Sequence, residues 1–448
     1  MQNCQISTLL FIVVAVSCFP SNEMIDVDEN KIRADEGLPH NYEHLDYCNH
    51  HKSVTSHEGT IFAGYSLKQV HIVLSPGHSD ASFKVKVENQ SFPPLPCDLK
   101  LFTTLKDFKT VTDMFKDINH NPHFHEFHPT FPKVCANDHL TSLGFEQLIS
   151  LGQLFNASYF SHGVHKKLKA KYSSLHVESI PTEKSYQSVL GFLYGLLERK
   201  QLLKTKIYRV NRNFCEFIES NISSCSCPKT QELAPHVSQA LTKGTFLFKP
   251  SYPNRENISN MFHSKIKSKT SGLELFNALM QYKCDSYLLE PCAADRQCKL
   301  FSNDKLAQLH SILANDHHFM KMDSVFRTYS ELRVYPFLQQ VLIRAKKSDH
   351  QSTNIYMGHS HFIQLLTTSL GVFRKQITPL ASRLVIEIYR KNGGQLDAGG
   401  LYLRFLYNGA DVTTEVSGCS LHMIDNFCKI EGLTDLVAAL RKQYLEQC

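Results

Sequence analysis

Short apolar runs that stop at turn residues alternate along this chain with longer stretches of helical periodicity. Gln69–Leu74 is a β-branched run that ends at the turn residues Ser75, Pro76 and Gly77, a pattern typical of a buried strand. Similar runs predict further strands over Ser174–Val177, Asn354–Met357, Leu384–Tyr389 and Leu401–Tyr407. Apolar residues at helical spacing predict helices over Leu140–Phe155, Ser185–Leu197 and Phe362–Leu370.

This alternation predicts an α/β domain whose sheet is mostly parallel and is covered by helices on both faces. Ligands of such sheets bind beyond the carboxyl ends of the strands, so the turns that follow the first three predicted strands should converge on one pocket. The last two strands should pair across a glycine-rich turn, and Asn408–Asp411 should be a hairpin turn. The block from about 200 to 345 is more helical and rich in cysteine, which indicates a cap beside the sheet.

The N-terminal segment predicts entry into the secretory pathway. The apolar run Leu9–Val16 is too short to span about 30 Å of hydrocarbon, and it suits the core of a signal peptide over residues 1–19. An uncleaved signal anchor is the alternative, and only in that case would the protein associate with a membrane. Residues 20–64 are polar and without sustained period, which indicates a stem or lead-in to a domain over 65–448.

Cysteine usage agrees with an exported protein. Of the 14 cysteines, Cys4 and Cys18 lie in the leader, and the remaining even set of twelve predicts disulfides formed in an oxidising compartment. A zinc site is the competing interpretation, but the pair Cys225 and Cys227 has no second pair at knuckle spacing. Four sequons predict glycosylation in the Golgi or on the secreted protein, at Asn89, Asn156, Asn221 and Asn257.

The charge of the chain is mildly basic, at +6 over 448 residues. It permits acidic ligands such as phosphosugars or sulfated glycans. No dense Lys/Arg stripe and no nucleic-acid-binding signature occurs, so nucleic acid is not an expected partner.

Six segments, in order and at matching intervals, carry a family resemblance over roughly residues 46–430. The segments are GYSLKQVHIVL (64–74), DHLTSLGFEQLISLGQLF (138–155), SYQSVLGFLYGL (185–196), NFCEF…SCSCP (213–228), YMGHSHFIQLLTTSLGV (356–372) and RLVIEIYRK…LYLRFLYNGADVT (383–413). With these segments the sequence resembles the histidine acid phosphatases, and in particular the branch that removes the 2-phosphate from xylose in the proteoglycan linker. The resemblance implies a phosphoglycerate-mutase-like α/β fold and a chemistry that needs no cofactor and no metal.

The family's chemistry depends on a histidine nucleophile in an RHGxR turn, on arginines that neutralise the phosphate, and on a late His-Asp pair that supplies a donor and the general acid. The resemblance implies that Ser75 stands in place of the first arginine and Pro76 in place of the nucleophile, while Gly77 is retained. His78 takes the variable position, and Ser79 takes the place of the second arginine.

The other two motifs are also altered. Glu178 and Lys184 stand where many members carry arginine, and the xylose-phosphatase branch has an acid at the first of these positions too. Lys184 keeps a cation without the bidentate fork of arginine. His359 matches the late histidine, so Lys184 and His359 are the expected phosphate contacts, whereas Ser360 replaces the acidic proton donor.

Loss of its nucleophile lowers the rate of a catalytic unit by a factor on the order of 10⁶. These replacements therefore predict a pseudophosphatase. It would act by binding a phosphosugar of the glycosaminoglycan linker, a glycosyltransferase or an active family relative. The alternative is an active phosphatase that removes the xylose 2-phosphate. It would use His359 with His78 as a substitute nucleophile, and Asp80 or Glu178 as the acid.

Two other patterns could carry chemistry. His120, His123, His125 and His128 form a local cluster that could bind zinc, but the prolines at 122 and 129 indicate a loop instead, so no metal site is predicted. The serines at 75, 79 and 360 lack the G-x-S-x-G elbow of a serine hydrolase.

Overall fold

A computed structural model describes the fold within the unit Tyr42–Cys448. The described residues are 46–49, 56–80, 86–87, 90–91, 95, 97, 134–135, 139–160, 175–209, 227–243, 272–285, 303–347, 351–374, 376–392 and 400–448. The predicted leader 1–19, the histidine cluster at 120–128 and the sequons at Asn89, Asn221 and Asn257 lie outside these residues. The fourth sequon is described: the side-chain amide of Asn156 donates to the Leu196 carbonyl oxygen at 2.8 Å.

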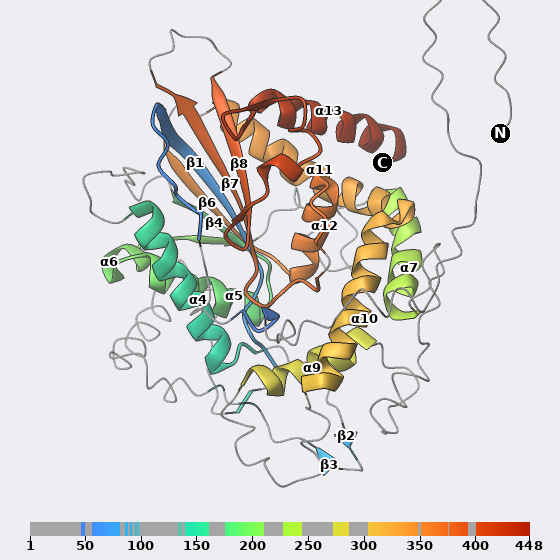
Figure 1. Cartoon of the computed structure of the whole chain (residues 1–448). Coiled ribbons are helices and arrows are strands. Elements are labelled where there is room, and N and C mark those ends of the chain that lie inside the picture. The colour runs from blue at the N-terminus through green and yellow to red at the C-terminus, as the bar shows by residue number, and fades with distance from the viewer. Residues whose placement is uncertain are drawn as a thin grey trace, which may run out of the picture. The chain divides into compact units, whose positions relative to one another are not determined.

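A nine-stranded sheet forms the centre of the fold (Figure 1). Its order is β10-β11-β8-β7-β1-β6-β4-β5, and β9 pairs with β8. The neighbours β1, β6, β4 and β5 are parallel, whereas the strands beyond β1 on the other side are antiparallel. The strands span β1 (Tyr65–Leu74), β4 (Leu175–Ser179), β5 (Ile207–Arg209), β6 (Ser352–Met357), β7 (Arg383–Lys391), β8 (Leu401–Tyr407), β9 (Ala410–Asp411), β10 (Met423–Ile424) and β11 (Phe427–Lys429).

The predicted α/β fold is therefore confirmed, with a parallel core and an antiparallel wing. All five predicted strands exist, and β7 and β8 pair as expected. The predicted hairpin is confirmed as the β8–β9 turn, where Asn408 and Gly409 adopt φ of 47° and 87°. A separate two-stranded sheet contains β2 (Lys86–Val87) and β3 (Gln90–Ser91).

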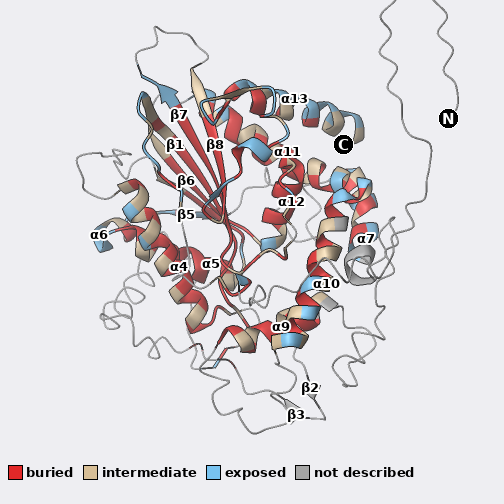
Figure 2. Ribbon diagram, in the orientation of Figure 1, coloured by how far each residue is buried: buried red, intermediate tan, exposed pale blue. Residues whose placement is uncertain are grey.

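The strands of the sheet are buried on both sides because helices cover both of its faces (Figure 2). On one face, α4 (Ser142–Phe155) and α5 (Glu183–Leu196) pack against alternate residues of β1 such as Val70 and Ile72. On the other face, α11 (Ser324–Lys347) and α12 (Ser360–Leu370) pack against Val73 and Tyr356, together with α13 (Ile430–Gln447). The predicted helices correspond to α4, α5 and α12.

The cysteine-rich middle block contributes further helices. These are α7 (Pro228–Lys243), α9 (Gly272–Cys284) and α10 (Asn303–Met322), while α11 from the same block lies against the sheet. The short elements are η4 (Asn156–Phe160), α6 (Arg199–Leu202) and η10 (Thr413–Glu415). The cap boundaries near 200 and 345 stay a prediction.

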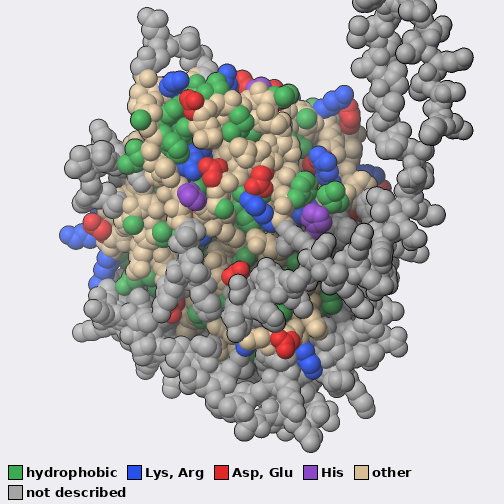
Figure 3. Space-filling view, in the orientation of Figure 1, with side chains coloured by type: hydrophobic (Ala, Val, Ile, Leu, Met, Phe, Trp, Pro, Cys, Tyr) green, Lys and Arg blue, Asp and Glu red, His purple; other side chains and the backbone are tan. Residues whose placement is uncertain are grey.

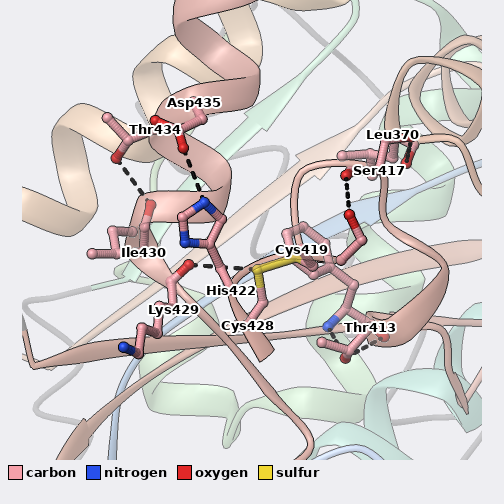
Figure 4. The surroundings of a disulfide bond; sticks show 12 residues. Leu370, Thr413, Ser417, Cys419, His422, Cys428, Lys429, Ile430, Thr434 and Asp435 are labelled. Atoms are coloured by element: carbon pink, nitrogen blue, oxygen red, sulfur yellow. Dashed lines mark hydrogen bonds and ion pairs between the residues drawn. A yellow bond between two sulfur atoms is a disulfide. The ribbon is translucent and has the colours of Figure 1, made fainter. Parts of the chain in front are cut away.

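Four disulfides join the described residues, as the even cysteine set predicted. They are Cys48–Cys284, Cys97–Cys135, Cys227–Cys448 and Cys419–Cys428. The last one holds the chain before α13 (Figure 4), where His422 Nε2 contacts Asp435 Oδ2 at 2.9 Å. Such bonds form and persist in oxidising compartments.

Part of the predicted lead-in is packed into the domain. Glu58 is buried and makes a bidentate ion pair with Arg383, whose side chain is 1% exposed. The adjacent Gly59 amide donates to Glu387 Oε1 at 2.6 Å. Cys48 is also buried, through its bond to α9. The segment before β1 therefore contributes to the core.

Basic and acidic side chains are interspersed on the face shown in Figure 3, and the described residues of that face form no patch of a single sign. Within the described part of the chain, no helix has the length and apolar character to cross a bilayer.

Candidate functional site

The three predicted turns meet at the carboxyl edge of the parallel strands. Leu74 and Ser179, the last residues of β1 and β4, both pair with Met357, the last residue of β6. The chain that follows continues this contact, since Gly358 N donates to Leu74 O at 2.9 Å and Ile180 N donates to Met357 O at 3.1 Å. Residues 75–79, 180–184 and 358–360 are thus the candidate site.

The first turn is bonded to the start of β7. The buried Ser75 donates its amide to Ser382 O at 2.9 Å, and its hydroxyl oxygen accepts from Ser382 N at 2.8 Å. The Pro76 carbonyl accepts from Ala381 N at 2.9 Å. The Ser75 side chain therefore stabilises the junction of β1 and β7.

Gly77 and His78 press against the N-terminus of α4. A Cβ atom at Gly77 would lie 2.5 Å from Gly144 O, and one at Gly144 would lie 2.0 Å from His78 O. The amide of His78 donates to Gln147 Oε1 at 2.8 Å. The turn and the helix thus touch backbone to backbone, which only glycine allows.

The His78 ring is buried between two other elements. Its Nε2 lies 2.7 Å from the Gln281 carbonyl oxygen of α9, and its Nδ1 lies 2.6 Å from the hydroxyl of Thr141, the N-cap residue of α4. A carbonyl oxygen only accepts, so Nε2 carries the proton and donates to Gln281 O. The Thr141 hydroxyl, which contacts Nδ1, also donates to the His78 carbonyl oxygen at 3.1 Å. In this arrangement the ring links the turn to α4 and α9.

The remaining residues of the turn and the neighbouring candidate residues are less buried than His78. Ser79 is half-buried and forms an isolated bridge with Leu140. His359 is half-buried and is the N-cap residue of α12, although its side chain does not cap the helix. Ser360 is exposed at the first position of that helix. Lys184 is half-buried in the first turn of α5.

Comparison with known proteins finds relatives that align over most of this chain. No protein-family model matches. The 2-phosphoxylose phosphatase 1 of Rattus norvegicus is 24% identical over 418 residues, which cover 88% of this chain and 82% of the relative. The Homo sapiens protein of the same name is 22% identical over 420 residues, with the same coverage. Counting factor 60 of Dictyostelium discoideum is 22% identical and covers 71% of this chain and 73% of its own length.

The solved structure of a multiple inositol polyphosphate phosphatase from Bifidobacterium longum has the same fold. It superposes with a TM-score of 0.51 at 11% identity, over 87% of this chain and 94% of that one. Relatives at 22–24% identity over most of the chain support an assignment of this protein to the histidine acid phosphatases. The relatives that carry this likeness are 2-phosphoxylose phosphatases.

Glu178 has an ion-pair partner that the sequence did not indicate. Its Oε1 accepts from His176 Nε2 at 2.5 Å and lies 3.4 Å from Nη2 of Arg344, which comes from α11. Arg344 also donates to Tyr356 OH at 2.8 Å. Glu178 Oε2 is buried and has no hydrogen-bond partner among the residues that the structure describes. The carboxylate is thus held on one oxygen only.

His71 of β1 lies beside this group. It is fully buried, stacks on Tyr356, and its Nδ1 lies 3.3 Å from the Tyr356 hydroxyl. Burial lowers the pKa of His71 to about 3, and the positive charge of Arg344 and the ring of His176 act in the same direction. His71 is therefore neutral above mildly acidic pH.

Among the described residues, no three His, Cys, Asp or Glu side chains are grouped so as to hold a metal ion. The histidine cluster at 120–128 is outside those residues.

Proposed function

We propose that this protein is a pseudophosphatase of the 2-phosphoxylose phosphatase branch. It binds a phosphorylated sugar of the glycosaminoglycan linker without hydrolysing it, in the Golgi lumen or after secretion. The observation that carries the proposal is the turn at 75–79. Pro76 has no nucleophilic side-chain atom, and the Ser75 hydroxyl is bonded to the backbone of Ser382.

Proline at the nucleophile position removes the covalent step, whose loss costs on the order of 10⁶ in rate. Two serines in place of guanidinium groups also remove two bidentate phosphate contacts. Ser360 lacks the acidity to protonate a leaving alkoxide. A binding role, with a glycosyltransferase or an active relative as protein partner, needs none of these groups.

The alternative is an active xylose 2-phosphatase with His78 as the nucleophile. His359 supports this alternative because it lies half-buried at the same edge. Attack by His78 would require Nδ1 to release the Thr141 hydroxyl, or Nε2 to lose the proton that it donates to Gln281. The ring would also have to leave its buried position. Both requirements favour the binding role.

The test is hydrolysis of p-nitrophenyl phosphate and of a 2-phosphoxylosyl linker oligosaccharide by the purified secreted protein. His78→Ala and His359→Ala variants are assayed beside it from pH 4 to 8, and a curated 2-phosphoxylose phosphatase serves as positive control. We expect no turnover above the variants. Turnover that disappears in a folded His78→Ala or His359→Ala protein would show an active enzyme and overturn the proposal.

A further inference from the structure

Three helices that are far apart in the sequence border a hollow, which we call the α7–α13 hollow. They are α7, the beginning of α11 and the end of α13. Figure 1 shows the end of the chain, marked C, beside α7. The hollow has a volume of about 540 Å³, and small-molecule sites occupy roughly 300–1,000 Å³. No residue of the candidate site at 75–79, 180–184 and 358–360 lines it.

Covalent and packing contacts hold the three helices together around the hollow. The disulfide Cys227–Cys448 joins the residue before α7 to the C-cap residue of α13. The rings of Tyr335 and Tyr444 lie 4.9 Å apart and connect α11 with α13. The buried Leu233 of α7 packs into the same apolar core as these rings. The walls of the hollow are therefore formed before a ligand binds, which lowers the entropic cost of binding.

The polar part of the hollow carries hydrogen-bonding groups without protein partners. Oε1 of Gln447 is buried, and no described residue donates to it. Ser324 and Thr328 are one turn apart on α11, and neither hydroxyl bonds to another described residue. Buried acceptors are rarely left without a donor. A hydroxyl group of a ligand in the hollow would supply a donor to the Gln447 oxygen.

The charged groups of the hollow balance one another. Lys229 of α7 and Glu446 of α13 line it with opposite charges. The Lys229 ammonium already contacts Glu232 Oε1 at 2.6 Å, and both of these side chains are partly exposed. A ligand with a single charge would thus meet one group of opposite charge and one of like charge. The lining favours an uncharged ligand.

Apolar side chains complete the lining. Leu233 is buried and Val325 is half-buried, and both contribute to the core against which α11 and α13 pack. A sugar ring presents C–H groups on its faces and hydroxyls around its rim, and each hydroxyl both donates and accepts. Such a ring matches a hollow in which apolar contact area lies beside a few polar groups.

We propose that the α7–α13 hollow binds an uncharged saccharide. Gln447 Oε1 and the hydroxyls of Ser324 and Thr328 bind hydroxyl groups of the sugar, and Leu233 and Val325 contact its ring. The inference goes beyond the proposed function and does not rest on it, because the hollow and the candidate site share no residue.

The experiment titrates the full secreted chain with glucose, galactose, glucuronate and glucosamine, and saturation-transfer NMR of the sugar signals detects binding. We expect glucose or galactose to bind saturably, and neither charged sugar to bind more tightly than these. The two charged sugars keep the ring of glucose and change one substituent. They therefore test whether Lys229 and Glu446 balance each other.

Two variants remove polar groups of the hollow. Thr328→Val removes one hydroxyl at nearly the same volume, and Gln447→Leu removes the buried amide. Each should weaken the affinity for the neutral sugar about three- to tenfold, as expected for the loss of one neutral hydrogen bond. Thr434→Val is the matched control and should leave the affinity unchanged. Thr434 is half-buried on α13, outside the hollow, and its hydroxyl donates to Ile430 O at 2.9 Å.

Three outcomes would overturn the inference. One is an absence of saturable binding of both neutral sugars to the wild type. Another is wild-type affinity in both Thr328→Val and Gln447→Leu, or an equal loss in Thr434→Val. The last is tighter binding of glucuronate or glucosamine, which would indicate an ionic site. Should Gln447→Leu fail to fold, Thr328→Val and Ser324→Ala must each weaken sugar binding or the inference fails.

Discussion

Glu387 shows how a buried charge is satisfied in this protein. Its carboxylate accepts from the Gly59 amide, the Tyr159 and Tyr389 hydroxyls and Arg404 Nη1, at 2.6 to 2.8 Å. Glu178 is bonded on one oxygen only, and Lys321 has a single long hydrogen bond. Fully hydrogen-bonded networks of buried polar groups stabilise a unique core, whereas partly bonded ones cost free energy.

Local sequence placed the candidate residues but not their partners. The runs before Ser75 and His359 predicted that these side chains follow strand ends, whereas Glu178 lies within β4 and not after it. Arg344 is 166 residues from Glu178 and lies in a helix without a motif, so no local pattern could pair the two.

Because the folded pKa of His71 is about 3, below the ordinary value of 6.5, the unfolded chain binds a proton more readily. Stability from this site is complete above about pH 6.5 and is lost as the pH falls toward 3. We expect His71→Asn to reduce the pH dependence of the unfolding free energy by about 1.4 kcal/mol per pH unit between these limits. Urea unfolding at a series of pH values measures this slope.

His57→Asn, at an exposed position, provides the control and should leave the slope nearly unchanged. An unaltered slope in His71→Asn would mean that His71 is already protonated in the folded protein.

At the scale of elements, hydrophobic pattern predicted the long segments and missed the short ones. β1 begins at Tyr65, four residues before the predicted start, because its first residues alternate less clearly and are half-buried beside β7. β5, β10 and β11 have two or three residues each, too few to show a period. The antiparallel wing beyond β8 was therefore not predicted.

The contact between α4 and the turn at 75–79 predicts whether a substitution in the helix stabilises or destabilises the protein. Alanine in place of a helical glycine usually stabilises by about 1 kcal/mol. At Gly144 a Cβ would lie 2.0 Å from the His78 carbonyl oxygen, so we expect Gly144→Ala to destabilise by about 2 kcal/mol or more. Chemical denaturation measures the difference.

Gln153→Ala, on the exposed side of the same helix, should change stability by no more than about 0.5 kcal/mol. If Gly144→Ala were stabilising instead, the turn would not touch the helix backbone as described.

Across the whole molecule, cysteine count predicted disulfides but could not predict their pairing. Cys48–Cys284 and Cys227–Cys448 join residues 236 and 221 positions apart, whereas Cys419–Cys428 spans nine. Pairing follows from the packing of distant elements, such as α7 and the end of α13, which a single sequence does not reveal.

Loop-closure entropy predicts that the disulfide that closes the longer loop stabilises the protein more than the one that closes the shorter loop. The chain-entropy model gives about 5 kcal/mol for Cys227–Cys448 and about 3 kcal/mol for Cys419–Cys428. We therefore expect the double serine variant at 227 and 448 to lose more stability than the one at 419 and 428. Guanidinium unfolding without reductant compares them, and the reverse order would indicate that native packing dominates over the entropy of the unfolded chain.

The ion pair of Glu58 with Arg383 has a practical consequence for anyone who prepares this protein. A chain shortened to start at Tyr65, where the first strand begins, would leave the Arg383 guanidinium buried without its carboxylate and would take one donor from Glu387. It would also leave Cys284 as an unpaired thiol. Trimming for crystals or for a soluble fusion should therefore stop before Tyr47, well upstream of where the sheet begins.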